Sequence, residues 1–122
     1  MNSPMQRLTI STAKMEESIQ FYQEVLEMKI LYDQSAVIEP GSETLLGTDI
    51  SGPYRLVSLQ QGDSTVGMLG LIEFKNPEIK VRPFEKKEGM PYPIVFVLRV
   101  DDVEQFATKV RNSGCQVISA GI

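Results

Sequence analysis

The pattern of apolar and polar residues near the start of the chain predicts a strand followed by a helix. Residues 8–12, Leu-Thr-Ile-Ser-Thr, alternate with a period of two, as a half-buried strand does. Met15, Ile19 and Tyr22 then recur at helical spacing. Two acidic residues occupy the first turn, where the helix dipole favours them. We expect this helix to end near Glu27.

The same pattern recurs near the end of the chain. Residues 96–100, Phe-Val-Leu-Arg-Val, predict a second strand. Val103 and Phe106 follow at helical spacing, and the N-cap is expected at Asp101 or Asp102. Because one strand and one helix bury little apolar surface by themselves, the two copies are expected to share a core.

Strand and turn signals divide the remainder of the chain. We expect strands over residues 29–32, 54–60 and 66–74, the last two joined by a glycine-containing hairpin. Four prolines within residues 75–93 predict a connection or lid, because proline cannot sit in a central strand. Residues 116–118 are expected to start a further strand. The first unit is therefore strand, helix and three strands, and the second is unfinished.

Composition and charge remove several classes of function. The chain has 122 residues, 42% of them hydrophobic, as expected for one globular domain. Its net charge of −4 has the wrong sign for binding nucleic acid. No apolar run is long enough to cross a membrane and no signal peptide is evident, so a cytoplasmic protein is expected. Without histidine, serine–histidine and cysteine–histidine catalysis and histidine-bound metals are excluded.

Three motifs carry a family resemblance. They are Ser-Ile-Gln-Phe-Tyr-Gln-Glu-Val-Leu-Glu-Met at residues 18–28, Gly-Leu-Ile-Glu-Phe at residues 70–74 and Val-Asp-Asp-Val at residues 100–103. Together they resemble the vicinal oxygen chelate superfamily, which includes glyoxalase I, extradiol dioxygenases, and fosfomycin and bleomycin resistance proteins. The resemblance covers nearly the whole chain, although Glu27 stands where the family usually has glycine.

The resemblance implies an α+β fold in which paired βαβββ modules form a cup-shaped mixed sheet around a small molecule. On this interpretation the chain is a single glyoxalase-like domain. Module one spans residues 5–76, a linker or lid spans 77–92, and a partial module two spans 93–122. Missing strands of the second module would leave a sheet edge uncovered, so a homodimer is expected.

Metal-dependent members of this superfamily bind a metal with residues at the start of the first strand and on the last strand of each module. By register these positions are Arg7, Glu73 and Val95, and the fourth lies beyond Ile122. A cation cannot be a ligand, and valine has no lone pair. Only Glu73 matches, so we expect no metal and no cofactor.

Glu73 has two interpretations. It is a surviving ligand or catalytic carboxylate, or it is a strand carboxylate neutralised by a neighbour, for which Arg7 is the obvious partner. Arg99 is a candidate for clamping an anionic ligand, because guanidinium matches carboxylate and phosphate. The predicted ligand-binding residues are Arg7, Thr9, Glu73, Val95 and Arg99.

These residues leave the function open between three classes. The first is a metal-free small-molecule-binding protein of the glyoxalase and bleomycin resistance type, holding an apolar or anionic ligand in the cup. The alternative is a metal-dependent lyase, isomerase or dioxygenase with Glu73 as a surviving ligand. The third is a dimerising module without a ligand.

Overall fold

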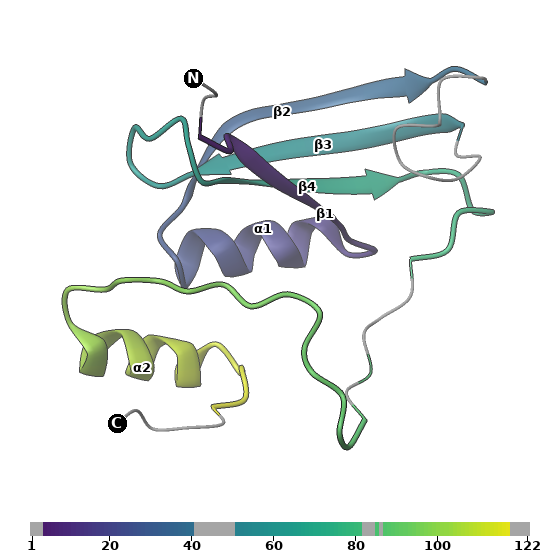
Figure 1. Cartoon of the computed structure of the whole chain (residues 1–122). Helices are drawn as coiled ribbons and strands as arrows, with labels where there is room; N and C mark the ends of the chain where they lie inside the picture. The colour runs from purple at the N-terminus through teal and green to yellow at the C-terminus, as the bar shows by residue number, and fades with distance from the viewer. Residues whose placement is uncertain (1–3, 41–50, 82–84, 86, 118–122) are drawn as a thin grey trace. The chain divides into compact units, whose positions relative to one another are not determined.

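Two separately compact units make up the chain, residues 1–81 and 82–122 (Figure 1). The computed structural model describes residues 4–40, 51–81, 85 and 87–117. The second unit contains α2 (Val103–Asn112). The first unit contains β1 (Arg7–Ser11), α1 (Met15–Glu24), β2 (Lys29–Ile38), β3 (Gly52–Gln60) and β4 (Met68–Phe74).

The four strands of the first unit form one mixed sheet in the order β1-β4-β3-β2. β1 runs parallel to β4, and the other neighbours are antiparallel. This confirms the α+β class and the predicted succession of strand, helix and three strands. β2 is longer than the four residues predicted, because it pairs with β3 from Lys29 opposite Gln60 to Ile38 opposite Gly52.

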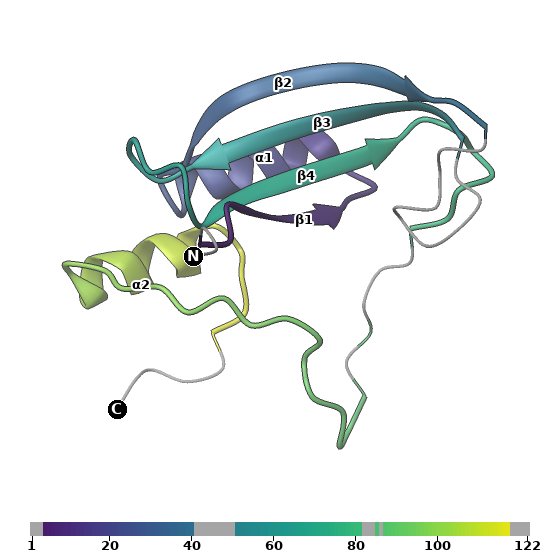
Figure 2. The ribbon, with the colours of Figure 1, turned by 45° about the horizontal axis from the view of Figure 1, so that its top comes forward.

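The hydrophobic core lies between α1 and one face of the sheet. Figure 2 looks onto the other face, with α1 behind the strands. Leu8 and Ile10 share the α1 side of β1, as the alternation predicts, and Ile10 packs against the core. Burial of a large apolar side chain contributes about 1.5–3 kcal/mol. The core residues are Met15, Ile19, Met28, Val57, Leu59, Leu69 and Leu71.

Glu27, just after the C-terminal end of α1, adopts a backbone conformation that favours glycine. Glu27 adopts a positive φ of 56°, the left-handed conformation in which glycine is favoured. The Met28 backbone N–H donates to the Tyr22 carbonyl at 3.1 Å, which closes the last turn. A glutamate thus holds, under strain, the left-handed conformation that favours glycine.

The second unit confirms one prediction and corrects another. α2 begins after Asp102, whose side chain accepts a hydrogen bond from the Gln105 N–H at 3.0 Å, as predicted. The strand predicted at residues 96–100 is absent: this described segment belongs to no strand, and Val97 is 91% exposed. Alternation alone does not make a strand, because its backbone groups need a pairing partner. Residues 116 and 117 also lie outside any strand, and residue 118 is outside the described residues.

Candidate functional site

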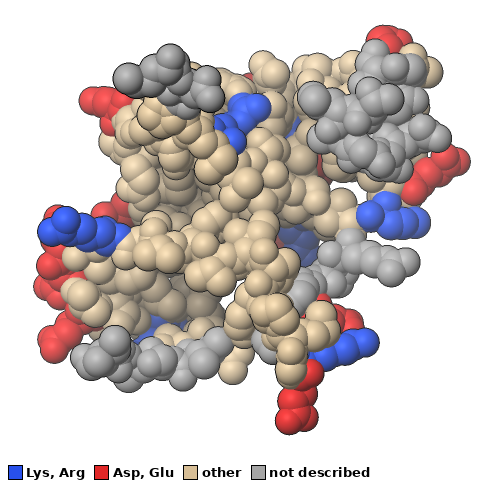
Figure 3. Space-filling model, viewed as in Figure 1, with Lys and Arg blue, Asp and Glu red and all other residues tan. Residues whose placement is uncertain are grey.

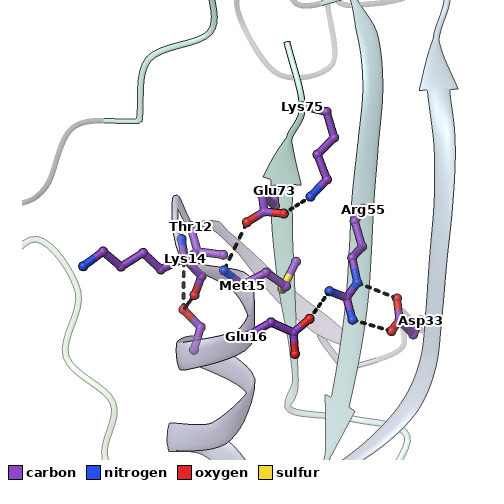
Figure 4. A network of polar contacts seen from close by, with 9 residues as sticks. Thr12, Lys14, Met15, Glu16, Asp33, Arg55, Glu73 and Lys75 are labelled. Carbon is purple, nitrogen blue, oxygen red and sulfur yellow. Dashed lines mark hydrogen bonds and ion pairs between the residues drawn. The ribbon is translucent and has the colours of Figure 1, made fainter. Parts of the chain in front are cut away.

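Glu73 lies on the α1 side of the sheet, on the same face of β4 as Leu69 and Leu71. Its Oε2 accepts a hydrogen bond from the Met15 backbone N–H at 3.1 Å, and Oε1 forms an ion pair with Lys75 (Figure 4). The Glu73 side chain is 17% exposed. The carboxylate is therefore fully engaged at the first turn of α1.

This contact supplies a cap that the sequence next to α1 does not. Lys14 is the N-cap residue and makes no side-chain capping bond, so the first N–H groups of the helix need another acceptor. The Glu73 carboxylate provides one and places negative charge at the positive end of the helix dipole. The hydrogen bond from Lys75 and, to a lesser extent, that from Met15 lower the pKa of Glu73 below its ordinary value.

Arg55 on β3 forms a second charged contact beside Glu73. Its Nε and Nη2 donate to the two carboxylate oxygens of Asp33 at 3.0 and 2.7 Å, and Nη1 donates to Glu16. The guanidinium thus joins β3 to β2 and to α1 (Figure 4). Its hydrogen bonds to Asp33 lower the pKa of that carboxyl group and raise the pKa of Arg55 itself.

A concave region of about 340 Å³ lies at the start of α1. The charged groups around it pair with one another: Arg55 with Glu16, Lys75 with Glu73, and Lys14 with Glu17 at 3.8 Å. Because these charges already have partners, we interpret the region as a network that fastens α1 to the sheet. Its lining residues are Lys14, Met15, Glu16, Glu17, Arg55, Glu73 and Lys75.

Arg7 lies on the opposite face, so the predicted ion pair between Arg7 and Glu73 is wrong. Arg7 pairs in register with Met68 at the start of β4, whereas Glu73 lies near the other end of that strand and on its other face. The Arg7 Nη1 donates to the Tyr32 hydroxyl, and the guanidinium carbon is 5.8 Å from the centre of the Tyr32 ring. Of the two interpretations of Glu73, the carboxylate neutralised by a neighbour fits, with Lys75 as that neighbour.

A row of four small or polar residues crosses the whole sheet beside Arg7. Thr9 pairs with Gly70, Gly70 with Ser58, and Ser58 with Tyr32. A Cβ atom on Gly70 would lie 2.5 Å from Thr9 Oγ1 and 3.0 Å from Arg7 Cδ, so only glycine leaves room for these side chains. Ser58 is fully buried. Within the part of the chain that the structure describes, the Ser58 hydroxyl has no hydrogen-bond partner.

Of the predicted ligand-binding residues, Arg7 and Thr9 lie on this face, whereas the sequence alone does not identify Ser58, Gly70 and Tyr32. Their row depends on the register of three strand pairs and on an irregularity between Ile30 and Tyr32 in β2. A glycine within an otherwise bulky β4 was the one available signal, since glycine inside a strand marks a close approach.

Val95 and Arg99, the remaining predicted ligand-binding residues, belong to the second unit. Both are exposed and lie outside any helix or strand. Their part in ligand binding stays a prediction.

The residues in register with the family's metal ligands do not fit a metal ion. Arg7 and Glu73 lie on opposite faces of the sheet, and Glu73 is engaged with Lys75 and Met15. Across the described residues, no group of three or more histidine, cysteine, aspartate or glutamate side chains could hold a metal ion. The donor set therefore differs in both chemistry and placement from a metal centre.

Charges of both signs are present on the surface drawn in Figure 3, where blue and red side chains occur within short distances of each other. Such mixed charge gives no extended basic surface on this face of the kind that tracks nucleic acid. In the described ranges, no helix combines the length and apolar character needed to span a membrane.

Comparison with known proteins gives one family and several related folds. The profile of the Glyoxalase/Bleomycin resistance protein/Dioxygenase superfamily matches residues 5–120. A glyoxalase family protein from Bacillus cereus superposes with a TM-score of 0.69 at 14% identity, over 98% of this chain and 77% of that one. The trypanothione-dependent glyoxalase I of Leishmania major superposes with a TM-score of 0.58 at 22% identity, over 93% and 68%. At these identities the likeness is one of fold. No curated protein matches the chain.

Proposed function

The chain belongs to the Glyoxalase/Bleomycin resistance protein/Dioxygenase superfamily, and on that premise we propose that it binds a small organic molecule without a metal. The ligand is proposed to lie on the sheet face opposite α1. The observation that carries the proposal is the separation of Arg7 from Glu73, which leaves that face with cationic and hydroxyl groups.

The chemistry of this face supports a small organic ligand. Leu56 and Ile72 lie on it beside the row of Thr9, Gly70, Ser58 and Tyr32, because they occupy the alternate positions of the same strands. Small-molecule sites typically combine apolar walls with a few fixed polar groups. In the first unit, the described helix α1 covers only the other face of the sheet (Figure 2).

The enzymatic alternative requires a rearrangement that the contacts of Glu73 oppose. To serve as a ligand beside Arg7, the carboxylate would have to leave Lys75 and the Met15 N–H and reach the other face of the sheet. Both contacts stabilise its charged form where it is. We therefore favour binding of the type expected for the bleomycin resistance branch over metal-assisted conversion.

An NMR titration tests this function. The isotope-labelled protein is titrated with a small panel of neutral and anionic aromatic compounds: benzamide, benzyl alcohol, benzoate and phenylphosphonate. We expect saturable shifts at the amides of Thr9, Ser58 and Gly70 with at least one compound. Shifts that instead gather around Glu16 and Lys75, or no saturable shift on the face opposite α1, would contradict the proposal.

A further inference from the structure

We propose that Arg7, Tyr32 and Ser58 form a subsite for the anionic oxygen group of the ligand, a carboxylate or a phosphate-type group. The inference rests on the proposed function and specifies the chemistry of the molecule that it binds. Its basis is the unsatisfied hydrogen-bonding capacity of these three residues in one place on the sheet.

Within the described part of the chain, Arg7 has a cationic group without an anionic partner. Among the described residues no carboxylate lies within ion-pair distance of it, whereas Arg55 binds both Asp33 and Glu16. A guanidinium has five N–H donors in a planar fork that matches carboxylate and phosphate oxygens. The Tyr32 hydroxyl accepts one of these donors, so the others remain available to a ligand.

Tyr32 has a donor of its own for the same ligand. Its hydroxyl oxygen accepts the hydrogen bond from Arg7, which leaves the hydroxyl hydrogen to be donated elsewhere. The Arg7 guanidinium carbon is 5.8 Å from the ring centre, so the cation and the ring lie against each other. An oxygen placed beside the guanidinium could therefore accept from both residues.

The buried hydroxyl of Ser58 gives independent support for the subsite. It pairs in register with Tyr32 on one side and Gly70 on the other, and it is fully buried. Its hydroxyl makes no hydrogen bond to any residue that the structure describes. Leaving a buried hydroxyl unpaired is unfavourable, and native proteins rarely do so without a partner such as a ligand or water. An anionic oxygen that displaces the atoms covering the row would accept this donor.

Gly70 makes the arrangement sterically possible. A Cβ atom at this position would lie 3.0 Å from Arg7 Cδ and 3.2 Å from Arg7 Nε. The Arg7 side chain therefore passes directly over the Gly70 backbone on its way to Tyr32. Glycine keeps the guanidinium close to the sheet, in the row that contains Ser58, where an added methyl group would lift it away.

The test compares benzoate and phenylphosphonate with neutral benzamide, using the backbone amides and the arginine Nε–Hε signals. We expect both anions, or one of them, to shift the Arg7 Nε–Hε signal with the amides of Ser58 and Gly70, and to bind about tenfold tighter than benzamide. A preference between the two anions identifies which oxygen group the subsite takes.

Three variants separate the subsite from general charge attraction. Arg7→Gln is expected to weaken benzoate binding about tenfold, and Arg111→Gln, the same change at an exposed residue of α2, to leave it unchanged. Ser58→Ala removes the hydroxyl without adding volume and is expected to weaken binding severalfold. Ser58→Ala also tests the subsite if the Arg7→Gln variant fails to fold. Gly70→Ala keeps the charge of Arg7 but displaces it, and is expected to weaken binding as well.

The outcomes distinguish the anion subsite from the proposed small-molecule binding on which it rests. Equal binding of benzamide and benzoate to this face, unaffected by Arg7→Gln and Ser58→Ala, would overturn the anion subsite and leave the small-molecule site standing. Equal weakening by Arg7→Gln and Arg111→Gln would also overturn it, because only net charge would then matter. Absence of any response on this face contradicts both.

Discussion

Glu73→Ala is the substitution that best tests the role given to this carboxylate. It removes the acceptor for the Met15 N–H and the partner of Lys75 while leaving the sheet face opposite α1 untouched. We expect the protein to remain folded and less stable, with ligand binding on the opposite face retained. A catalytic or metal-binding role predicts loss of binding with little change in stability.

The expected loss in the free energy of unfolding follows from the contacts that Glu73 makes. Loss of an N-terminal cap costs about 1 kcal/mol. Removing the charge from the helix dipole costs about 0.3–1 kcal/mol. The ion pair with Lys75, whose side chain is 50% exposed, adds at most about 0.5 kcal/mol after solvent screening. Together these predict a loss of about 2 kcal/mol for Glu73→Ala and about 1 kcal/mol for Glu73→Gln, which keeps an acceptor.

Urea unfolding followed by far-ultraviolet circular dichroism measures these differences, with Glu78→Gln as the control at an exposed carboxylate. The folded pKa of Glu73 lies below its unfolded value, so the unfolded state binds more protons as the pH falls. The stabilising effect is therefore complete above about pH 4.3 and is lost as the pH drops through the lowered pKa. A Glu73→Gln variant as stable as the wild type at pH 7, or a difference that grows in acid, would refute the capping role.

Three further predictions follow from other contacts. Carbon NMR should show the Asp33 carboxyl group titrating below its usual pKa, and Arg55→Met should return that pKa to its usual value. The contribution of this ion pair to the free energy of unfolding is complete above about pH 4 and is lost as the pH falls through the lowered pKa. Glu27→Gly should raise the free energy of unfolding by up to about 1 kcal/mol by relieving the positive φ, whereas Glu27→Ala should not. The exposed apolar residues 94–98 predict self-association by sedimentation, and a monomer at micromolar concentration would contradict the expected homodimer.

The sequence predicts the first unit well because its signals are local. Alternation in residues 8–12 and helical spacing from Met15 identify β1 and α1, and the hairpin between β3 and β4 follows from its glycine-containing turn. The strand expected at residues 96–100 fails for a non-local reason. Its composition suits a strand, but the described residues form no ladder with it.

The site is less predictable because it depends on register. Glu73 lies on β4, and Lys75 follows two residues later, directly after the strand ends at Phe74, so their pairing could be inferred from spacing. The predicted pairing of Arg7 with Glu73 rests instead on the positions of a metal site, which assumes that both residues face the same side. The row of Thr9, Gly70 and Ser58 becomes visible only when β1, β4 and β3 are aligned.

The most direct test of a metal-free ligand site on the face opposite α1 is a benzoate titration repeated after exhaustive chelation and again with added zinc or manganese. Elemental analysis of the same samples reports the metal content. The structure predicts the same shifts at Thr9, Ser58 and Gly70, with the same affinity, in all three conditions. Binding that is lost on chelation, restored by the metal and abolished by Glu73→Gln would contradict the account.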